Sequence, residues 1–505
     1  MLPEVPAERK TTMMKKNKWF AAAIIGAQLM AASAGADDTA DAIAALKQQI
    51  QALSSRVQEL EAQHQADIQK PALAVGEKPA PGATEDVTAG TKAPPFITAG
   101  EGGFTMQSAD TNFTLKLHGM GQLDSHYYAS PNPGAKDTFT MRRLRAVASG
   151  TVYKDYDYYM QVDFGSGFLA TTTNNNLLLD AYVDIHNFQP LQLKAGKMRV
   201  PVSLEVQPAD ENLYLVERGY PSELAPNRDV GFMLHGDLLH NSLYYGIGAF
   251  NGVPDGNSGD IEVADNEKDV AGRIFAQPFT NTDIAALKKF GLGFGGSYGI
   301  EAGTTTPSFS TMGRQKFFSY DSGSGTAASP NVTEAGGHVR LDPQGWYYWG
   351  PVGLYWEYIV SSEKFQLDSG AKHTQEWFDN RAWDVTASWY LTGENNAFWS
   401  PPAPLHPFRF DGSGWGAWQL LGRVQGISLD NAAFAKKANF VTANSAEDAT
   451  TWGVGLDWFW NRNIKWIFEY EQTSFGFAPG AAAPKAGNVA AKNERVFMSR
   501  LQFGF

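Results

Sequence analysis

Residues 493–505 read NERVFMSRLQFGF and have the alternating pattern of a β-strand. Successive side chains of a strand point to opposite faces, so one face is apolar and ends in aromatic residues, and the other is mixed and polar. Such a strand suits a wall between lipid and water, although an edge strand of a soluble sheet shares the pattern. The apolar face comprises Phe497, Ser499, Leu501, Phe503 and Phe505, and the other face comprises Val496, Met498, Arg500, Gln502 and Gly504.

The same alternation recurs in segments 179–186, 453–460 and 464–471. In the first of these, Asp180 and Asp184 fall on the face opposite to a row of Leu, Ala, Val and Ile. A soluble sandwich would keep such acids outside its dry core, whereas a barrel in a bilayer has an apolar outside and a wet, polar lumen. The pattern therefore predicts an all-β fold, a transmembrane antiparallel β-barrel.

The composition favours a barrel over a helical membrane protein. The 505 residues are 43% hydrophobic and 13% aromatic, yet beyond the N-terminal leader no apolar run is long enough for a membrane helix. A chain that crosses a bilayer without such helices must close its sheet, because every backbone polar group needs a hydrogen-bond partner. The absence of cysteine excludes disulfides and thiolate metal sites.

The N-terminal region has the features of an exported protein. Lys15, Lys16 and Lys18 precede an apolar run over 19–30, and Ala34-Gly35-Ala36 supplies a cleavage signal, which predicts a signal peptide over 1–36. A membrane anchor is the weaker alternative because the run is short.

A heptad pattern follows the leader. Its apolar residues are spaced 3, 4, 3, 4, 3, as positions a and d of a coiled coil require, and they predict a short periplasmic coiled-coil helix over 37–70. About three and a half heptads are marginal alone, so we expect the helix to need partners, which a homotrimer would supply. A single amphipathic helix on another surface, or a periplasmic partner bound through 43–60, is the alternative. The heptad residues are Ile43, Leu46, Ile50, Leu53, Val57 and Leu60.

A Pro-, Ala- and Gly-rich stretch over 71–105 predicts a flexible linker, and 106–505 is the predicted outer-membrane barrel. We expect about sixteen strands, beginning near Phe113, with two consecutive strands at 333–343 and 345–361. An even strand number is usual for bacterial barrels, and sixteen strands leave an aqueous channel. Tight turns are expected on one side and long loops on the other, the longest being 302–332, 362–379 and 393–414.

Four stretches give the barrel a family resemblance. They are MRRLRAVASGTVYKDYDYYMQVDF at 141–164, LKAGKMRVPVSLE at 193–205 with ERGYPSELAPNRDVG at 217–231, GAWQLLGRVQGISLD at 416–430, and WGVGLDWFWNRNIKWIFEYEQ from 452 with the terminal RLQFGF. In this order and spacing they resemble the phosphate-selective porin O and P family. The resemblance implies a sixteen-stranded trimeric porin that passes anions, some members preferring phosphate or polyphosphate.

The resemblance also implies site residues. The family's tandem arginines, which point at the constriction and bind the anion, match Arg142 and Arg143. Alternation places Arg143 and Arg145 on one face, toward water, because a charge at the lipid midplane costs about 2–4 kcal/mol. Arg142 breaks this alternation and is expected near the strand end or the lumen rim. An ordinary solvated strand face is the alternative to a pore role.

A family acid matches Asp180, which in a lumen could fix arginine side chains by ion pairing and orient their forks toward an oxyanion. An unpaired lumen carboxylate is the alternative. The segment 201–228 is expected to fold into the pore and narrow it. Further cations predicted to line the pore are Lys194 and Lys197, with Arg218 and Arg228 in the constriction segment.

Several positions depart from the family pattern. Val206 replaces a lysine, Ala209 and Asp210 replace paired hydroxyls, and the loop expected to supply an arginine ladder has only Arg314 and Lys316. An electropositive path needs clustered cations to concentrate anions, so these departures indicate a weaker and less selective site.

Other functions fit the sequence less well. Removal of 1–36 leaves 36 basic and 51 acidic residues, a net charge of −15, which argues against a nucleic-acid partner. No spacing of His, Ser or acidic residues suggests a catalytic constellation, so no enzyme activity, metal or cofactor is predicted. We expect a passive channel for inorganic or small organic anions, surrounded by outer-membrane lipid of a Gram-negative cell. A porin without anion selectivity, or a structural tether that uses the coiled coil, is the alternative.

Overall fold

The computed structural model describes residues 96–129, 135–165, 177–259, 266–303, 306–435, 440–478 and 492–505. The predicted signal peptide 1–36, the coiled coil 37–70 and residues 71–95 of the predicted linker lie outside the described residues and stay predictions. Among the described residues, no helix is both long and apolar enough to cross a bilayer.

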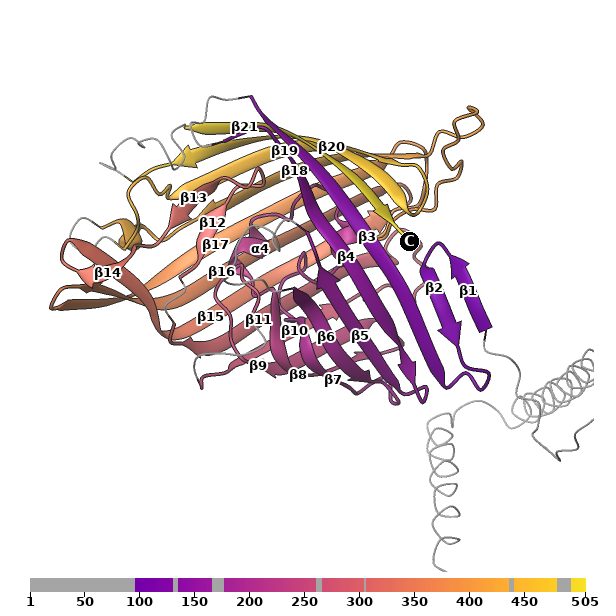
Figure 1. Cartoon of the computed structure of the whole chain (residues 1–505), viewed down its shortest axis with the longest axis horizontal. Helices are drawn as coiled ribbons and strands as arrows, with labels where there is room; N and C mark the ends of the chain where they lie inside the picture. The colour runs from indigo at the N-terminus through magenta and orange to yellow at the C-terminus, as the bar shows by residue number, and fades with distance from the viewer. Residues whose placement is uncertain are drawn as a thin grey trace, which may run out of the picture. The chain divides into compact units, whose positions relative to one another are not determined.

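Sixteen described antiparallel strands form a closed barrel, as the sequence predicted (Figure 1). The last strand pairs with the first, in a register from Val496 with Tyr128 to Gly504 with Met120. The wall strands are β3 (Phe113–Tyr128), β4 (Thr138–Val152), β5 (Tyr156–Asp163), β6 (Leu178–Ile185), β7 (Gln192–Arg199), β8 (Arg228–Leu238), β9 (Leu243–Phe250), β10 (Asp269–Ala276), β11 (Lys289–Glu301), β15 (Ser329–Trp349), β16 (Val352–Ser369), β17 (Lys372–Tyr390), β18 (Ala417–Ser428), β19 (Asp448–Phe459), β20 (Ile464–Gly476) and β21 (Asn493–Gly504).

The two faces of β21 are those that alternation predicts. Phe497 and Phe503 are 41% and 43% exposed on the outside of the wall, whereas Val496 and Arg500 are buried on the inside. Arg500 binds Asp124 of β3 through two contacts of 2.7 Å across the strand pair that closes the barrel. Bidentate pairs of this kind fix geometry as well as charge, so this ion pair helps to set the register of closure.

Part of the predicted linker is a strand pair. β1 (Phe96–Gly100) and β2 (Gly103–Gln107) form a hairpin that begins inside the segment 71–105 and extends past its end, and β2 pairs with β3 from Phe104–Leu117 to Gln107–Thr114. The linker prediction is therefore wrong for 96–105. The physical reason is that β21 pairs with β3 only from Met120 onward, which leaves the start of β3 free to accept another strand.

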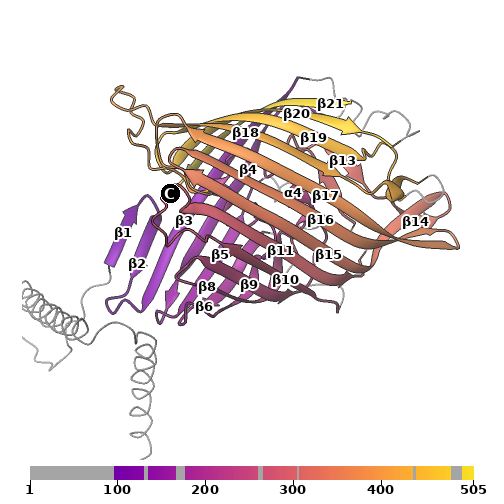
Figure 2. The same ribbon diagram turned by 180° about the vertical axis from the view of Figure 1, so that it is seen from behind.

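Two predicted boundaries in the longest wall strands are also wrong. β15 passes through Pro343 instead of ending there, because its register with β11 continues at Phe294 although proline lacks a backbone donor. The predicted loop 362–379 is instead a hairpin in which β16 and β17 pair as far as Ser369 and Lys372. Figure 2 shows these long strands from behind.

Most of the turns and loops follow the expected asymmetry, with three exceptions. The connection 277–288 is a longer one at the short-turn end, and the two-residue turn 370–371 lies at the long-loop end. The connection between β17 and β18, residues 391–416, lies at the same end as the tight turns 350–351 and 460–463, although the sequence grouped 393–414 with the long loops. The first part of this connection turns inward, whereas Leu405 and Phe410 farther along are exposed. Trp399 is buried, and the Ala397 carbonyl accepts a 2.6 Å hydrogen bond from the Tyr214 hydroxyl inside the barrel.

Much of the barrel interior is filled by protein. The segment 200–227, which contains η1 (Asp210–Asn212) and α4 (Pro221–Leu224), packs there beside the small sheet of β12 (Ser308–Ser310) and β13 (Lys316–Ser319). A further strand, β14 (Ser322–Thr326), pairs with β15, and a third short helix is η2 (Asn431–Phe434). An apolar cluster joins these pieces to inward side chains of β15–β21, including Val216, Tyr220, Phe309, Phe317, Ile359, Phe378 and Ile467.

Candidate functional site

The segment 200–227 is anchored to the inner face of the barrel wall. The backbone N–H groups of Leu204 and Glu205 donate to the Glu357 carboxylate of β16, at 2.9 and 3.0 Å. Farther along, the Val216 N–H donates to Glu469 of β20 at 2.7 Å, and the Tyr220 N–H donates to Gln425 of β18 at 2.8 Å. A buried loop must satisfy its backbone donors, and here wall side chains do so.

A β-bulge in β4 directs two consecutive arginines to the interior. Gln122 of β3 pairs with Arg143 while its neighbour Leu123 pairs with Met141, so Arg142 is the extra residue of the bulge. Met141 and Leu144, on either side, are 42% and 39% exposed on the outside of the wall. The bulge explains why Arg142 breaks the alternation: it lies inside the barrel with Arg143, and not at the rim.

Glu217 of the inserted segment binds both of these arginines. Its carboxylate lies 2.5 Å from Arg142 Nε and 3.2 Å from Arg143 Nη2, and 3.6 Å from Arg500 Nη2. Burial raises the pKa of the Glu217 carboxyl, but the three guanidinium charges outweigh that effect and hold the pKa well below its ordinary value. Glu217 therefore stays ionised and neutralises part of the arginine charge.

Asp210 is the centre of a larger arginine cluster. Arg145 and Arg218 both donate to its carboxylate. Arg143, Arg199 and Arg228 place guanidinium nitrogens 3.8, 3.7 and 3.8 Å from it. Burial raises the pKa of the Asp210 carboxyl, but the surrounding arginines, Arg145 first, lower it well below its ordinary value. A carboxylate thus occupies the place in which these five forks converge.

We call this set of paired residues the arginine network. Among the described residues it joins seven arginines to five acids, which leaves a formal net charge of +2. The arginines are Arg142, Arg143, Arg145, Arg199, Arg218, Arg228 and Arg500, and the acids are Asp124, Asp163, Asp180, Asp210 and Glu217.

The other predicted site residues take different positions. Asp180 binds Arg228 Nε at 3.0 Å, and not the arginines of β4. Lys194 binds Asp184 at 3.2 Å and lies over the Tyr182 ring, 4.7 Å from its centre, outside the network. Lys197 is buried on β7, in register with Ala181 of β6 and Val230 of β8.

Sequence reasoning did not name six members of the network as site residues: Arg199, Arg500, Asp124, Asp163, Asp210 and Glu217. The inward face of β21 already contained Arg500, so parity could have identified it. Asp210 was recognised only as a departure from the family pattern. Nothing in the local sequence pairs Glu217 with Arg142, because this contact joins residues 75 positions apart.

Three cavities share lining residues. The first is lined chiefly by β3, β20, β21 and η1, the second by β2–β6, and the third by β5–β9 and the segment 200–227. One of 430 Å³ includes Lys116, and a second of 430 Å³ also includes Lys116 and extends to Tyr182. Tyr182 also lines the third, of 260 Å³, which contains Asp180 and Arg199 of the network. The three cavities are therefore neighbours in a series that reaches from the turn 460–463 to the arginine network.

Comparison with known proteins agrees with this architecture. The profile of the family described as "Phosphate-selective porin O and P" matches residues 116–474. Porin O of Pseudomonas aeruginosa is 29% identical over 128 residues, which are 25% of this chain and 29% of that protein. The aligned part thus spans less than a third of that relative.

Solved structures show lower sequence similarity. A loop L8 deletion mutant of OmpT from Vibrio cholerae is 11% identical, with a TM-score of 0.46 over 78% of this chain and 100% of its own. An anion-selective porin from Comamonas acidovorans is also 11% identical, with a TM-score of 0.45 over 78% and 100%.

The match of the family profile covers well over half of the chain. A closed barrel with an apolar outer face is the form in which such proteins cross the outer membrane of Gram-negative bacteria. The chain belongs to the phosphate-selective porin O and P family of outer-membrane porins.

Proposed function

We propose that the protein is a passive outer-membrane channel that favours small inorganic or organic anions. The observation that carries the proposal is the arginine network: seven guanidinium groups and five carboxylates meet inside the barrel, beside open space, with a net charge of +2. Excess positive charge in a narrow, low-dielectric passage raises the local concentration of anions.

The proposed path runs from the long-loop end to the short-turn end. Anions meet Arg142 first among the network arginines, since it is the least covered, with 24% of its side chain exposed. They then pass Arg199 and Lys194, which both line the 260 Å³ cavity, and reach the cavities that contain Lys116. Conduction needs binding that is strong enough to attract and weak enough to release.

We infer weak selectivity for phosphate. A phosphate oxyanion binds best to arginine forks with free donors. Here Asp210 accepts hydrogen bonds from Arg145 and Arg218, and Glu217 accepts from Arg142 and Arg143. Phosphate would have to displace these carboxylates before it could bind to the arginines. Monovalent anions such as chloride should therefore pass with little block by phosphate.

A homotrimer is the proposed assembly, supported by the heptads of 43–60 and the family resemblance. Size measurement of the detergent-solubilised protein by light scattering should give three chains per particle. Deletion of 37–70 should lower the temperature at which the trimer dissociates. A stable monomer of the intact chain would contradict this assembly.

Planar-bilayer recordings of the intact protein test the channel proposal. We expect stepwise conductance and a reversal potential that indicates faster passage of chloride than of potassium. The complete absence of conductance steps would overturn the channel, and a preference for potassium would overturn the anion selectivity while leaving a general porin.

A further inference from the structure

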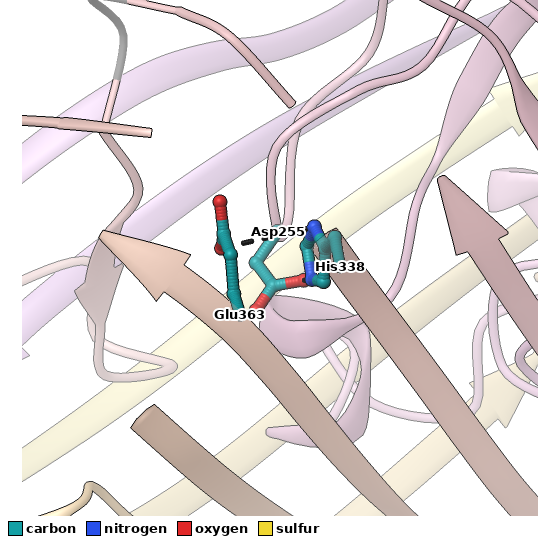
Figure 3. A group of neighbouring side chains, drawn as sticks. All are labelled: Asp255, His338 and Glu363. Atoms are coloured by element: carbon teal, nitrogen blue, oxygen red, sulfur yellow. Dashed lines mark ion pairs between the residues drawn. The ribbon is translucent and has the colours of Figure 1, made fainter. Parts of the chain in front are cut away.

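Two polar groups inside the barrel differ in what they border. The first is a buried cluster in which His338 and Glu363 of the wall meet Asp255 (Figure 3). Asp255 Oδ1 lies 3.2 Å from His338 Nε2 and accepts a 2.8 Å hydrogen bond from Arg340 Nε, so this cluster is held together by its own ion pairs. The second group consists of tyrosines and cations on β5–β9, and it lines the 260 Å³ cavity. The second group is therefore the one that a ligand can reach.

Three half-buried tyrosines contribute to this cavity. Tyr159 of β5 and Tyr182 of β6 are in register, and their rings stack with 5.4 Å between centres and 13° between planes. Tyr244 of β9 lies along the wall over Gly246, since a Cβ at that glycine would be 3.0 Å from the Tyr244 hydroxyl oxygen and 3.4 Å from Met233 Sδ. The rings therefore form part of the cavity surface instead of filling it.

Part of the cavity lining is apolar. Met198 and Met233 are 2% and 5% exposed, belong to one apolar cluster of the wall, and pack with Tyr182. Thioether sulfur is polarizable and makes favourable contacts with aromatic rings. An apolar cavity of about 150 Å³ holds a benzene molecule. The 260 Å³ cavity therefore has room for one aromatic ring that carries a small polar group.

Lys194 adds a cation to the same lining. Its ammonium nitrogen lies 4.7 Å from the centre of the Tyr182 ring and 3.2 Å from Asp184, its ion-pair partner among the described residues. An ammonium group has three donors. Asp184 therefore leaves Lys194 able to donate to a ligand as well.

The remaining charges of the lining favour an anion. Arg199 Nη1 donates to the carbonyls of Val206 and Gln207 at 2.8 and 2.7 Å, so Arg199 supplies positive charge more than free donors. Asp180, the acid of the lining, is paired with Arg228 at 3.0 Å. Two cations, Lys194 and Arg199, against the one acid give the lining a formal charge of +1.

We propose that this cavity, which we call the tyrosine subsite, binds small aromatic carboxylates on the anion path, benzoate being the simplest example. The carboxylate contacts Lys194, and the ring lies against Tyr244 and the two methionines. Apolar walls with a few well-placed polar groups are typical of sites for small organic ligands. Chloride and phosphate gain nothing from the apolar lining, and acetate gains little more than the charge contact. The proposal rests on the proposed anion channel and adds the class of organic anion that it favours.

Block of chloride current in planar bilayers by added carboxylates tests the subsite. The half-blocking concentration of benzoate should be at least about tenfold lower than that of acetate, because burial of a ring adds hydrophobic free energy. It should also be at least about threefold lower than that of cyclohexanecarboxylate, because methionine sulfur and tyrosine rings attract an aromatic ring. Equal block by benzoate and either of the other two carboxylates would overturn the proposed ligand class.

Variants separate the two parts of the subsite. Lys194→Gln should weaken the block by both benzoate and acetate at least about threefold. Tyr244→Leu should weaken the block by benzoate at least about threefold and leave the block by acetate unchanged. Tyr245→Leu is the matched control, because Tyr245 is the next residue of β9 but donates to the Pro190 carbonyl at 2.9 Å and does not line the cavity. Equal benzoate block in Tyr244→Leu and Tyr245→Leu would overturn the subsite.

A binding measurement separates failure of the subsite from failure of the channel. Each variant is first checked for the folded barrel by its heat-modifiable mobility in gels, and Tyr182→Leu replaces Tyr244→Leu if the latter does not fold. Saturation-transfer NMR of benzoate with the detergent-solubilised full-length protein should give a signal that is weaker in the tyrosine variant. Absence of conductance with this signal present would overturn the channel alone. Chloride conductance without the signal would overturn the subsite alone.

Discussion

Replacement of Asp210 by asparagine should increase anion selectivity. The side chain keeps its shape, but the carboxylate at the centre of the five arginines loses its charge. The network then has seven arginines and four acids, so its net charge rises from +2 to +3. The donors of Arg145 and Arg218 would also become available to a passing anion.

The size of the effect follows from Coulomb's law. For an anion about 6 Å from the Asp210 carboxylate, loss of one negative charge is worth roughly 0.7 kcal/mol at the permittivity of water and about 2.8 kcal/mol at an effective permittivity of about 20. Because about 1.4 kcal/mol is a tenfold change, occupancy of the site by anions should rise about 3- to 100-fold.

The assay is the block of chloride current by added phosphate in planar bilayers. The half-blocking phosphate concentration of Asp210→Asn should be at least threefold lower than that of the wild type. Glu211→Gln is the matched control, since it removes the same charge one residue away, and no ion pair to an arginine is found for Glu211 in the described part of the chain. Equal block in the wild type and Asp210→Asn, or an equal gain in Glu211→Gln, would refute the reasoning.

Two further predictions concern stability. The variant Asp124→Asn breaks the ion pair with Arg500 that joins β3 to β21 where the barrel closes, and it leaves Arg500 buried with only Glu217 at 3.6 Å. The free energy of unfolding should therefore fall by about 3 kcal/mol. The urea midpoint of unfolding should fall in this variant and should not change in the exposed Asp379→Asn control. The lowered pKa of Asp210 predicts a pH dependence: its ion pairs stabilise the fold above the ordinary pKa of 3.8, and this contribution is lost only as the pH falls through the lower folded-state value. The urea midpoint of the wild type should therefore exceed that of Asp210→Asn by a constant amount from pH 8 to pH 5, and a difference that disappears above pH 5 would contradict the assignment.

Local alternation was enough to predict the barrel and much of its inner surface. It placed Arg143, Arg145 and Arg500 on inward faces because a two-residue period is a property of each strand alone. Alternation could not place Arg142, since a bulge adds one residue and reverses the faces on one side of it. The same limit applies to Pro343, where pairing with a neighbouring strand overrides the local preference of proline to end a strand.

The acids of the site could not be predicted from local sequence. Asp210 and Glu217 lie in a segment without a repeating pattern, and their partners come from β4, β7, β8 and β21. The sequence left open whether Asp180 pairs with the arginines of β4 or stays unpaired, and the return of the chain at Arg228 brings a different guanidinium to 3.0 Å from it. Contacts of this kind depend on how the inserted segment folds against the wall.

The most direct test of the account is the reversal potential of the double variant Arg142→Ala, Arg143→Ala under a KCl gradient, compared with the wild type. Both side chains project into the barrel at the β4 bulge and contact Glu217, so their removal changes the formal charge of the network from +2 to 0. We predict that the wild type is anion-selective and that the double variant shifts toward potassium. A reversal potential that is the same in both proteins would contradict the claim that the arginine network sets selectivity.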